Sequence, residues 1–447
     1  MTIPQTAAPG TDSYRNVAAI VIALAILQTA LGGLSVVGPL TLLSQGAAPM
    51  KIGAIVSAYA LGFLLGARLA PREIMQIGHI RAIAGFAAAA SLGAASLYIS
   101  GAMAWWMLVQ FIIGLCVAGF LASGESWIAD AAPSQSRGAI LGFYLVTSKL
   151  GFMAGPFLVA GAPTGTATGF LIVAALLTAS LIPVCATRRA EPAIPTTKPF
   201  SPLKIWSFAP SAIIAALISG MVSGAVLQLY AVFIQDFSAA SVTQTAALFN
   251  AAMIGGSVIA TWPAGMLSDR IDRRLVIAGL AIVAGGSALI LALFSGLLPQ
   301  AAIFAIAALW GAGALSYYGV AVAHAADRAP EGQATSMMSG ILMVWALGSM
   351  IGPLVASVVM SLIGPSGLFY FAATALFTLT GLMLVRRTGT PPVRSEDKAD
   401  FEPTATTSVS VIELTERAGE DQEFAADPET EFGSEFDTEF EDASWRD

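Results

Sequence analysis

The chain has 447 residues, of which 56% are hydrophobic and only 11% are charged. Soluble globular domains carry about 25% charged residues, so this composition excludes an ordinary water-soluble protein and indicates an integral membrane protein. The mean hydropathy of +0.77 agrees with that class. The net charge of −7 is unevenly distributed, since residues 1–395 sum to +8 and residues 396–447 sum to −15.

Uncharged runs recur along the first 386 positions. Each has about 20 residues, which is enough to cross a hydrocarbon layer ~30 Å thick as a helix. The runs are continuous and do not alternate polar with apolar residues, which excludes barrel strands. The sequence therefore predicts twelve transmembrane helices, near residues 17–40, 52–71, 81–100, 104–130, 138–160, 166–186, 209–234, 243–266, 275–296, 299–325, 333–363 and 366–386.

Basic residues lie in alternate connections between these spans. If the chain starts inside, every inner connection carries Lys or Arg, whereas the outer connections carry only Lys51. Short loops rich in Lys and Arg stay in the cytoplasm. We therefore expect both termini to be cytoplasmic, with residues 1–16 as the N-terminal segment ahead of a retained first span.

The chain also repeats itself. Gly62 matches Gly256 at an offset of 194, and residues 151–156 match residues 348–353 at an offset of 197. Twelve helices in two parallel repeats, with a site between them, describe a fold of secondary transporters. We expect an all-α membrane protein with pseudo-symmetric six-helix halves at 17–186 and 209–386, a cytoplasmic linker at 187–208 and a disordered acidic tail at 387–447.

A burst of charge, GMLSDRIDRR at residues 265–274, directly follows the uncharged run 243–264. It resembles the loop signature of the major facilitator superfamily (MFS), Gly-x-Leu-x-Asp-Arg-x-Gly-Arg-Lys/Arg, with Asp272 in place of the second glycine. The resemblance implies the MFS fold and a cytoplasmic gate whose aspartate caps a neighbouring helix end and pairs with arginines when the transporter faces outward. The matching gate residues are Gly265, Leu267, Asp269, Arg270, Arg273 and Arg274. A positively charged inner loop with solvated side chains is the alternative.

Two stretches of the first half depart from the MFS pattern. Within residues 66–82, the equivalent stretch of the first half, Met75 and Gln76 replace the aspartate and arginine of the signature, so this gate is altered. In span 4, Gln110 replaces an arginine that the family often associates with proton transfer. Farther along span 4, Glu125-Ser126-Trp127 resembles a branch of bacterial inner-membrane permeases, which implies a multi-pass protein of the bacterial cytoplasmic membrane.

Span 5 resembles the antiporter signature of the same superfamily, Gly-x8-Gly-x3-Gly-Pro-x2-Gly-Gly. Glycines at this spacing allow close helix packing, and proline removes a backbone hydrogen bond. The resemblance favours export, whereas ordinary helix packing is the alternative. The matching residues are Gly142, Gly151, Gly155 and Pro156.

Two ionisable residues, Lys149 and Glu125, lie at different depths within predicted spans, and a charge at the bilayer centre costs at least ~2.5–3.5 kcal/mol on insertion scales. Lys149 is near the middle of span 5 and is expected to face a central cavity as a substrate contact or counter-charge, with a structural role as the alternative. Glu125 either protonates during transport or is a structural partner of Arg137 or Arg68. The full list of candidates for the substrate and ion pathway is Gln28, Glu125, Lys149, Gln228, Tyr230, Tyr317 and Tyr318.

No phosphate-binding run of the form Gly-x4-Gly-Lys-Ser/Thr occurs, so transport must use a gradient. His79 and His324, both expected on inner loops, are far apart, and we expect no enzyme activity, cofactor, metal or nucleic-acid partner. The function expected is a secondary transporter in the lipid bilayer that exports a small neutral or amphipathic organic molecule, coupled to protons. An uptake permease of the same fold and a non-transporting membrane platform are the alternatives.

The platform alternative comes from the acidic tail. Residues 396–447 contain 18 acidic and three basic residues, a composition that favours disorder. Four Glu-Phe pairs recur between residues 423 and 440, the last three spaced by four residues. A transient helix would bring these phenylalanines to one face, where a cytoplasmic partner could bind. A solvated tail without a partner is the other interpretation.

Overall fold

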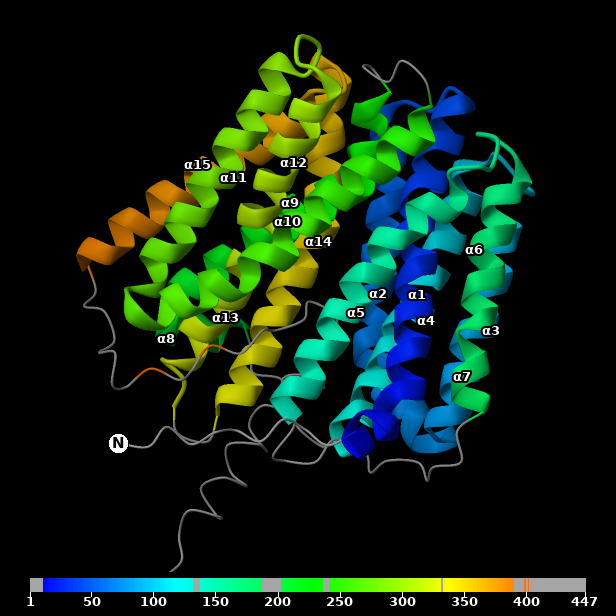
Figure 1. Ribbon diagram of the computed structural model, residues 1–447, viewed down its shortest axis with the longest axis horizontal. Coiled ribbons are helices and arrows are strands. Elements are labelled where there is room, and N and C mark those ends of the chain that lie inside the picture. Colours follow the sequence, from blue (N-terminus) through cyan, green and yellow to red (C-terminus); the bar gives the residue numbers. More distant parts are fainter. Residues whose placement is uncertain are drawn as a thin grey trace, which may run out of the picture.

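The computed structural model describes residues 11–131, 137–186, 202–235, 241–330 and 333–389, together with Lys398 and Phe401. Every regular element in these ranges is an α-helix (Figure 1). The first half contains α1 (Thr11–Ser44), α2 (Pro49–Ile77), α3 (His79–Ser96), α4 (Met103–Ala131), α5 (Arg137–Val159), α6 (Ala167–Ala179) and α7 (Leu181–Cys185). After α8 (Pro202–Phe208), the second half contains α9 (Pro210–Ile234), α10 (Val242–Arg270), α11 (Arg273–Phe294), α12 (Gln300–Ala314), α13 (Tyr317–Ala326), α14 (Ala334–Ile363) and α15 (Gly367–Gly389).

Eleven candidate spans in the described ranges are long and apolar enough to cross a membrane. Two of them are interrupted, because α6 and α7 form one span, as do α12 and α13. Helix α3 completes the up-and-down order as the twelfth, and it is less apolar because it begins with His79 and contains Arg81. The predicted architecture, an all-helical bundle of two six-helix halves, is confirmed.

The two ends of the bundle are named here by their connections. The gate end carries the turn Ile271–Asp272 between α10 and α11, and the far end carries residues 45–48 between α1 and α2. The gate end is at the bottom of Figure 1, near α8 and α13. Because successive spans alternate in direction, Arg68 and Arg72 in the last turns of α2 lie towards the gate end, and Lys51 lies at the far end.

The gate-end connections are shorter than the sequence predicts. Helix α2 continues to Ile77, so residues 72–77, which follow the predicted second span, are helical, and the turn is Gly78 alone at φ 83°. Its 29 residues span about 43 Å at 1.5 Å per residue, so the last polar turns extend beyond the ~30 Å hydrocarbon layer. His79 and His324, expected on loops, are buried helix residues.

The ends of the domains also differ from the predicted boundaries. Helix α1 begins at Thr11, inside the segment assigned to the N-terminus, and α8 lies inside the predicted linker 187–208. Helix α15 ends at Gly389, three residues into the predicted tail. Residues 423–440, with the Glu-Phe pairs, lie outside the described residues.

The repeat appears in the packing of the two halves. A Cβ at Gly62 in α2 would collide with the carbonyl oxygen of Phe111 in α4, and a Cβ at Gly256 in α10 would collide with that of Ala308 in α12. Glycines 194 positions apart therefore bring equivalent helices into backbone contact, as small residues do at membrane-helix interfaces. The sequence repeat reflects this shared packing.

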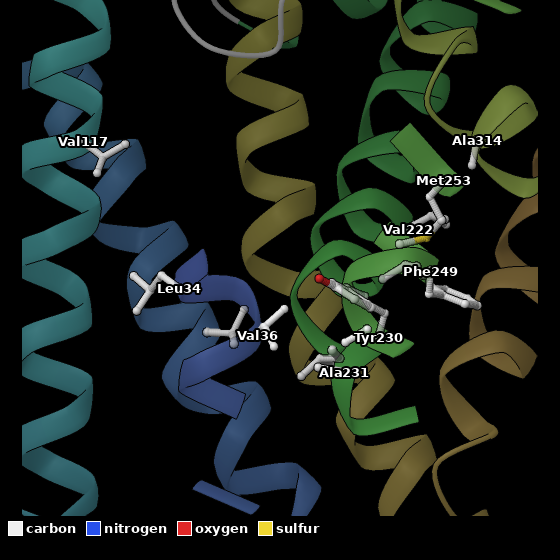
Figure 2. Close-up of a cluster of buried hydrophobic side chains, with 14 of the residues drawn as sticks. Leu34, Val36, Val117, Val222, Tyr230, Ala231, Phe249, Met253 and Ala314 are labelled. Carbon is white, nitrogen blue, oxygen red and sulfur yellow. The ribbon is translucent and has the colours of Figure 1, made fainter. Parts of the chain in front are cut away.

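The halves meet at the far end. In Figure 2, Val36 of α1 lies beside Tyr230 and Ala231 of α9. Val36 and Ala231 are both fully buried. The bundle is thus tightly packed across its halves at this end.

Two further helix pairs join the halves. In the pair α2 and α14, a Cβ at Gly53 would collide with Ser357, near the far-end termini of both helices. In the pair α5 and α10, Thr243 Oγ1 donates to the carbonyl oxygen of Ala160 at 3.2 Å. These contacts close the far end of the space between the halves.

Candidate functional site

A cavity of about 650 Å³ lies between the halves. Its walls come from α1, α2, α4 and α5 on one side and from α9, α10, α12, α13 and α14 on the other. None of the described residues of α3, α6, α11 or α15 lines it, and these helices lie at the outside of the bundle in Figure 1. Most of the lining is aliphatic or aromatic, which suits an organic solute of drug-like size.

The structure brings some of the predicted pathway residues to this cavity and places others elsewhere. Gln28, Lys149, Gln228 and Tyr318 line it. Tyr230 and Tyr317 are fully buried and are not part of the described lining. Tyr230 stacks on Phe249 with ring centroids 6.1 Å apart, and therefore belongs to the packed core beside the far-end contact.

Lys149 reaches from α5 across to α10. Its Nζ donates to Ser257 Oγ at 3.1 Å and to Thr261 Oγ1 at 3.4 Å. Both hydroxyls donate their own protons to carbonyl oxygens of α10, so their oxygens are free to accept from the ammonium. The contact joins the two halves near the middle of both helices, beside the cavity that Lys149 lines.

Glu125 does not line the cavity but is linked to it. Its carboxylate is fully buried and accepts a hydrogen bond from Tyr144 Oη of α5. Tyr144 lies on the cavity wall, one helical turn before Ser148 and Lys149. The sequence did not single out Tyr144, because a contact between residues 19 positions apart on two helices depends on how the helices are rotated.

A second polar contact lies beside Glu125. His79 Nε2 is 3.4 Å from Ser126 Oγ, and both side chains are buried. The contact connects the first turn of α3 to the gate-end part of α4. Glu125 and Ser126 are thus buried polar residues of the first half, with Tyr144 of α5 and His79 of α3 as their respective partners.

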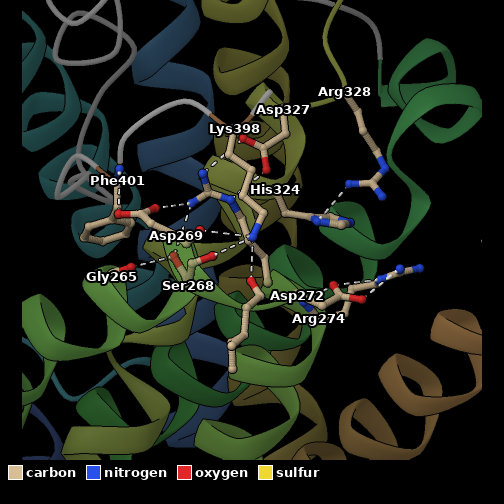
Figure 3. A network of polar contacts seen from close by, with 12 residues as sticks. Gly265, Ser268, Asp269, Asp272, Arg274, His324, Asp327, Arg328, Lys398 and Phe401 are labelled. Carbon is tan, nitrogen blue, oxygen red and sulfur yellow. Dashed lines mark hydrogen bonds and ion pairs between the residues drawn. The ribbon is translucent and has the colours of Figure 1, made fainter. Parts of the chain in front are cut away.

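The gate residues form a network in the second half (Figure 3). Arg273, 1% exposed, donates Nε to Asp327 Oδ2 at 2.7 Å and Nη2 to Asp327 Oδ1 at 3.0 Å. It also lies 3.3 Å from the carboxylate of Asp269, one turn earlier in α10. Asp327 was missed by the sequence analysis, because it lies 54 positions from Arg273 and no local spacing connects them.

The cap of α11 is Asp272 rather than Asp269. Asp272 Oδ1 accepts the backbone N–H of Arg274 at 3.0 Å, and its carboxylate also pairs with the Arg274 guanidinium at 2.9 Å. A carboxylate at a helix N-terminus is favoured by the exposed N–H groups and the helix dipole. The residue that departs from the family signature therefore starts the next helix.

Asp269 instead contacts the chain beyond α15. Its Oδ2 accepts from the backbone N–H of Phe401 at 3.3 Å, and the Phe401 ring covers Gly265, where a Cβ would collide with it (Figure 3). Lys398 Nζ donates to the carbonyl oxygens of Ser268 and Ile271 at the C-terminus of α10. Of the remaining gate residues, Leu267 and Arg270 are exposed.

The antiporter-like glycines of α5 have two different environments. A Cβ at Gly151 or Gly155 would collide with carbonyl oxygens of α1, whereas Gly142 has open space and lines the cavity. Pro156 lies within α5, one residue beyond the tight contact. The later part of the motif thus packs α5 on α1, and its first glycine widens the cavity.

Replacing Asp272 with alanine is expected to destabilise the protein by about 1–2 kcal/mol, the upper part of the range for an N-cap. Burial raises the pKa of Asp272, but the hydrogen bonds and charge of Arg274 outweigh it and hold the pKa below its ordinary value of 3.8. The contribution of the charge is therefore complete above that value and is lost as the pH falls through the lowered pKa.

Thermal unfolding in detergent would measure this effect, with Asp272→Asn as the matched variant. Asparagine keeps the cap but removes the charge, so it should lose less stability than alanine at pH 7. Equal stability of Asp272→Ala and the wild type would show that the cap does not matter for α11.

Comparison with known proteins agrees with the geometry. The family model of the Major Facilitator Superfamily matches residues 18–259 and 212–425. The MFS-type transporter YcaD of Escherichia coli O17:K52:H18, named as uncharacterised, is 27% identical over 388 residues, covering 85% of this chain and 97% of YcaD. A similarly named MFS-type transporter of Enterobacter sp. (strain 638) is 25% identical over 393 residues, covering 85% of this chain and 97% of the relative.

Solved structures share the fold. The nucleoside transporter NupG aligns with a TM-score of 0.69 at 12% identity, covering 83% of this chain and 99% of NupG. A bacterial homologue of the human lysosomal transporter Spinster, in an inward-facing and unoccupied conformation, aligns with a TM-score of 0.63 at 15% identity, covering 92% of this chain and 99% of the homologue. The family match, the membrane spans and the cavity between two repeated halves lead to one conclusion: the chain belongs to the major facilitator superfamily and is a multi-pass membrane transporter, not an enzyme.

Proposed function

We propose that the protein exports a small amphipathic organic solute from the bacterial cytoplasm by alternating access, driven by the proton gradient. The observation that carries the proposal is the cavity between the halves, closed at the far end by contacts of α1 with α9, α2 with α14 and α5 with α10. Such a cavity presents its site to one side of the membrane at a time when the halves rock about it.

The gate end is assigned to the cytoplasm. Arg68, Arg72, Arg270 and Arg328 belong to this end, whereas Lys51 lies at the far end. Basic residues near span ends are retained on the cytoplasmic side. In this orientation the described conformation faces the cytoplasm, where an exporter loads its substrate. Export rather than uptake rests on the resemblance of α5 to the antiporter signature.

Glu125 is the proposed proton carrier. Buried carboxylates within membrane spans mark proton pathways, because the charged form is costly there and protonation removes the cost. Tyr144, which donates to Glu125 and lines the cavity, connects the carboxylate to the space where the solute binds. Solute and proton would thus act on neighbouring groups of α4 and α5.

The experiment is a flux measurement with the purified full chain in liposomes that contain a pH-sensitive dye. We expect some members of a chemically varied compound panel to trigger proton movement in the wild type, and Glu125→Gln to reduce it at least tenfold. Glu73→Gln, which neutralises an exposed carboxylate of α2, is the control and should retain the flux. Compounds placed inside or outside the liposomes report the direction.

Two results would contradict the proposal. Full proton flux in Glu125→Gln would assign coupling to another group. No flux with any compound, from protein shown to be folded, would favour the platform alternative, in which the acidic tail recruits a partner. Deleting residues 402–447 distinguishes these functions, because a transporter keeps its flux without the tail and a platform loses its role.

A further inference from the structure

The charge of the cavity lining is the basis for an inference about the substrate. Among the lining residues that the structure describes, Lys149 is the sole Lys, Arg, His, Asp or Glu. The remaining polar side chains are neutral: the hydroxyls of Ser, Thr and Tyr, the indole N–H groups of Trp262 and Trp345, and the amides of Gln28, Gln110 and Gln228. The cavity therefore carries one positive charge in a largely apolar wall.

The surroundings of Lys149 satisfy its hydrogen bonds without balancing its charge. An ammonium has three donors, and Ser257 and Thr261 accept from two of them. Both acceptors are neutral, so they solvate the ammonium as water would but supply no counter-charge. In the described part of the chain, Lys149 takes part in no salt bridge, which leaves one donor and the whole charge for a molecule in the cavity.

The energetics favour an anion at this position. A cation near the bilayer centre costs at least ~2.5–3.5 kcal/mol on insertion scales. Attraction between opposite charges is several-fold stronger at a partly buried site than in water, because the effective dielectric constant is lower. A bound anionic group would supply the missing counter-charge, whereas a cationic group would be repelled and a polyanion would bring unbalanced negative charge into the apolar wall.

The rest of the wall defines the body of the ligand. Phe63 of α2, Phe152 of α5, Trp262 of α10 and Trp345 of α14 line the cavity together with leucine and valine side chains. Aromatic and aliphatic walls bind apolar surface, and a volume of about 650 Å³ lies within the usual range for drug-sized ligands. The charged group and the apolar wall are found in one cavity, so one molecule can contact both.

We infer that the substrate is an amphipathic organic monoanion, whose carboxylate or sulfonate pairs with Lys149 and whose apolar body lies against the aromatic wall. The inference rests on the proposed transport function and names the substrate class of that same cavity. The sequence predicted a neutral or amphipathic solute. The inference keeps the amphipathic body and replaces the neutral solute with one that carries a single negative charge.

The test compares two compounds of nearly equal shape, 1-naphthylacetate and its neutral amide 1-naphthylacetamide. Binding to the purified full chain in lipid nanodiscs is measured by isothermal titration calorimetry, with empty nanodiscs subtracted. Matched pairs built on benzoate and decanoate extend the range of apolar bodies. We expect at least one carboxylate to bind the wild type at least tenfold more tightly than its amide, a difference of about 1.4 kcal/mol.

Variants assign the preference to Lys149. Lys149→Gln should remove the preference for the carboxylate while keeping the binding of the amide, and Lys149→Arg should restore most of it. Lys51→Gln removes the same charge at the far end, outside the cavity, and should change neither affinity. Loss of anion binding in Lys51→Gln would indicate a general surface effect and would contradict the inference.

The wild-type comparison is decisive even if a variant does not fold. The inference is overturned if none of the carboxylates binds the wild type more tightly than its amide, which includes the case of no binding. It is also overturned if the preference for the carboxylate persists in Lys149→Gln. The outcome is separate from the test of proton coupling. A selective anion site without proton flux would reject the coupling proposal alone, whereas Glu125-dependent flux of neutral compounds would reject the monoanion alone.

Discussion

Arg273→Ala is expected to destabilise the protein by about 3–5 kcal/mol, because it removes one partner of a buried ion pair and leaves the other charged. The two-bond contact of Arg273 with Asp327 is made by side chains that are each 1% exposed. Arg273 also donates to Ser268 Oγ at 3.2 Å. Replacing Arg273 with alanine would therefore remove the guanidinium that donates to both Asp327 and Ser268.

A double-mutant cycle separates this interaction from other effects of the substitutions. The variants are Arg273→Ala, Asp327→Ala and the double variant, with unfolding followed in mixed micelles of increasing denaturing detergent. The double variant should lose less stability than the sum of the single variants, because the two side chains interact directly. Arg270→Ala, an exposed neighbour, is the control and should change stability by no more than about 0.5 kcal/mol. Similar effects for Arg270→Ala and Arg273→Ala would show that the buried pair does not stabilise the fold.

This ion pair also changes the interpretation of the gate motif. Arg273 begins α11 and Asp327 follows α13, and both belong to the second half. Their contact fixes helices within one half, so its loss should affect stability more than the opening and closing between halves. Arg274 also connects helices within this half, because its Nη1 donates to the carbonyl oxygen of Arg386 near the end of α15.

Much of the architecture is encoded locally and could be predicted. Each span is a continuous apolar run, and the direction of the chain alternates between short connections, so span order follows from the sequence. The offsets of 194 and 197 correctly paired Gly62 with Gly256 and Gly155 with Gly352, because small residues are needed where helix backbones touch. The recurring apolar runs and the repeated glycines are therefore enough to predict the fold class.

The contacts of the candidate site are less local. Lys149 was placed near the middle of span 5 by counting, but its neighbours Ser257 and Thr261 lie 108 and 112 positions away. Glu125 accepts a hydrogen bond from Tyr144, 19 positions further along the chain, which no local spacing in the sequence indicates. Which face of a nearly uniformly apolar helix turns inward depends on packing against neighbours, and hydropathy along one chain carries little of that information.

Breaks within spans were also beyond the sequence analysis. The tenth span divides at Leu315 and Ser316 into α12 and α13, although no proline interrupts it. Ser316 lies 3.3 Å from Thr261 Oγ1, and Tyr318 in the following turn lines the cavity. The break therefore lies at the cavity, where Ser316 contacts α10.

The close approach of α2 to α4 and of α10 to α12 predicts a large effect from a very small change. Gly62→Ala and Gly256→Ala should each destabilise the protein by about 3 kcal/mol, at the upper end of the usual cost of overpacking. The added methyl would collide with a backbone carbonyl oxygen, at Phe111 or Ala308, and a backbone cannot change rotamer as a side chain can. Relief requires the two helices to move apart, which breaks neighbouring contacts along the same interface.

Gly286→Ala in α11 is the matched control, because the same methyl would meet nothing within 4 Å there. Alanine is the better helix former by up to about 1 kcal/mol, so this variant should be as stable as the wild type or more stable. Thermal unfolding of the three variants in one detergent compares them directly. Unchanged stability of Gly62→Ala and Gly256→Ala would contradict the backbone contact, whereas a loss at Gly62 alone would show that the two halves are not equivalent in packing. Equal losses at both positions would mean that the repeat first visible as spaced glycines is also an energetic repeat, with each half held together by the same helix contact.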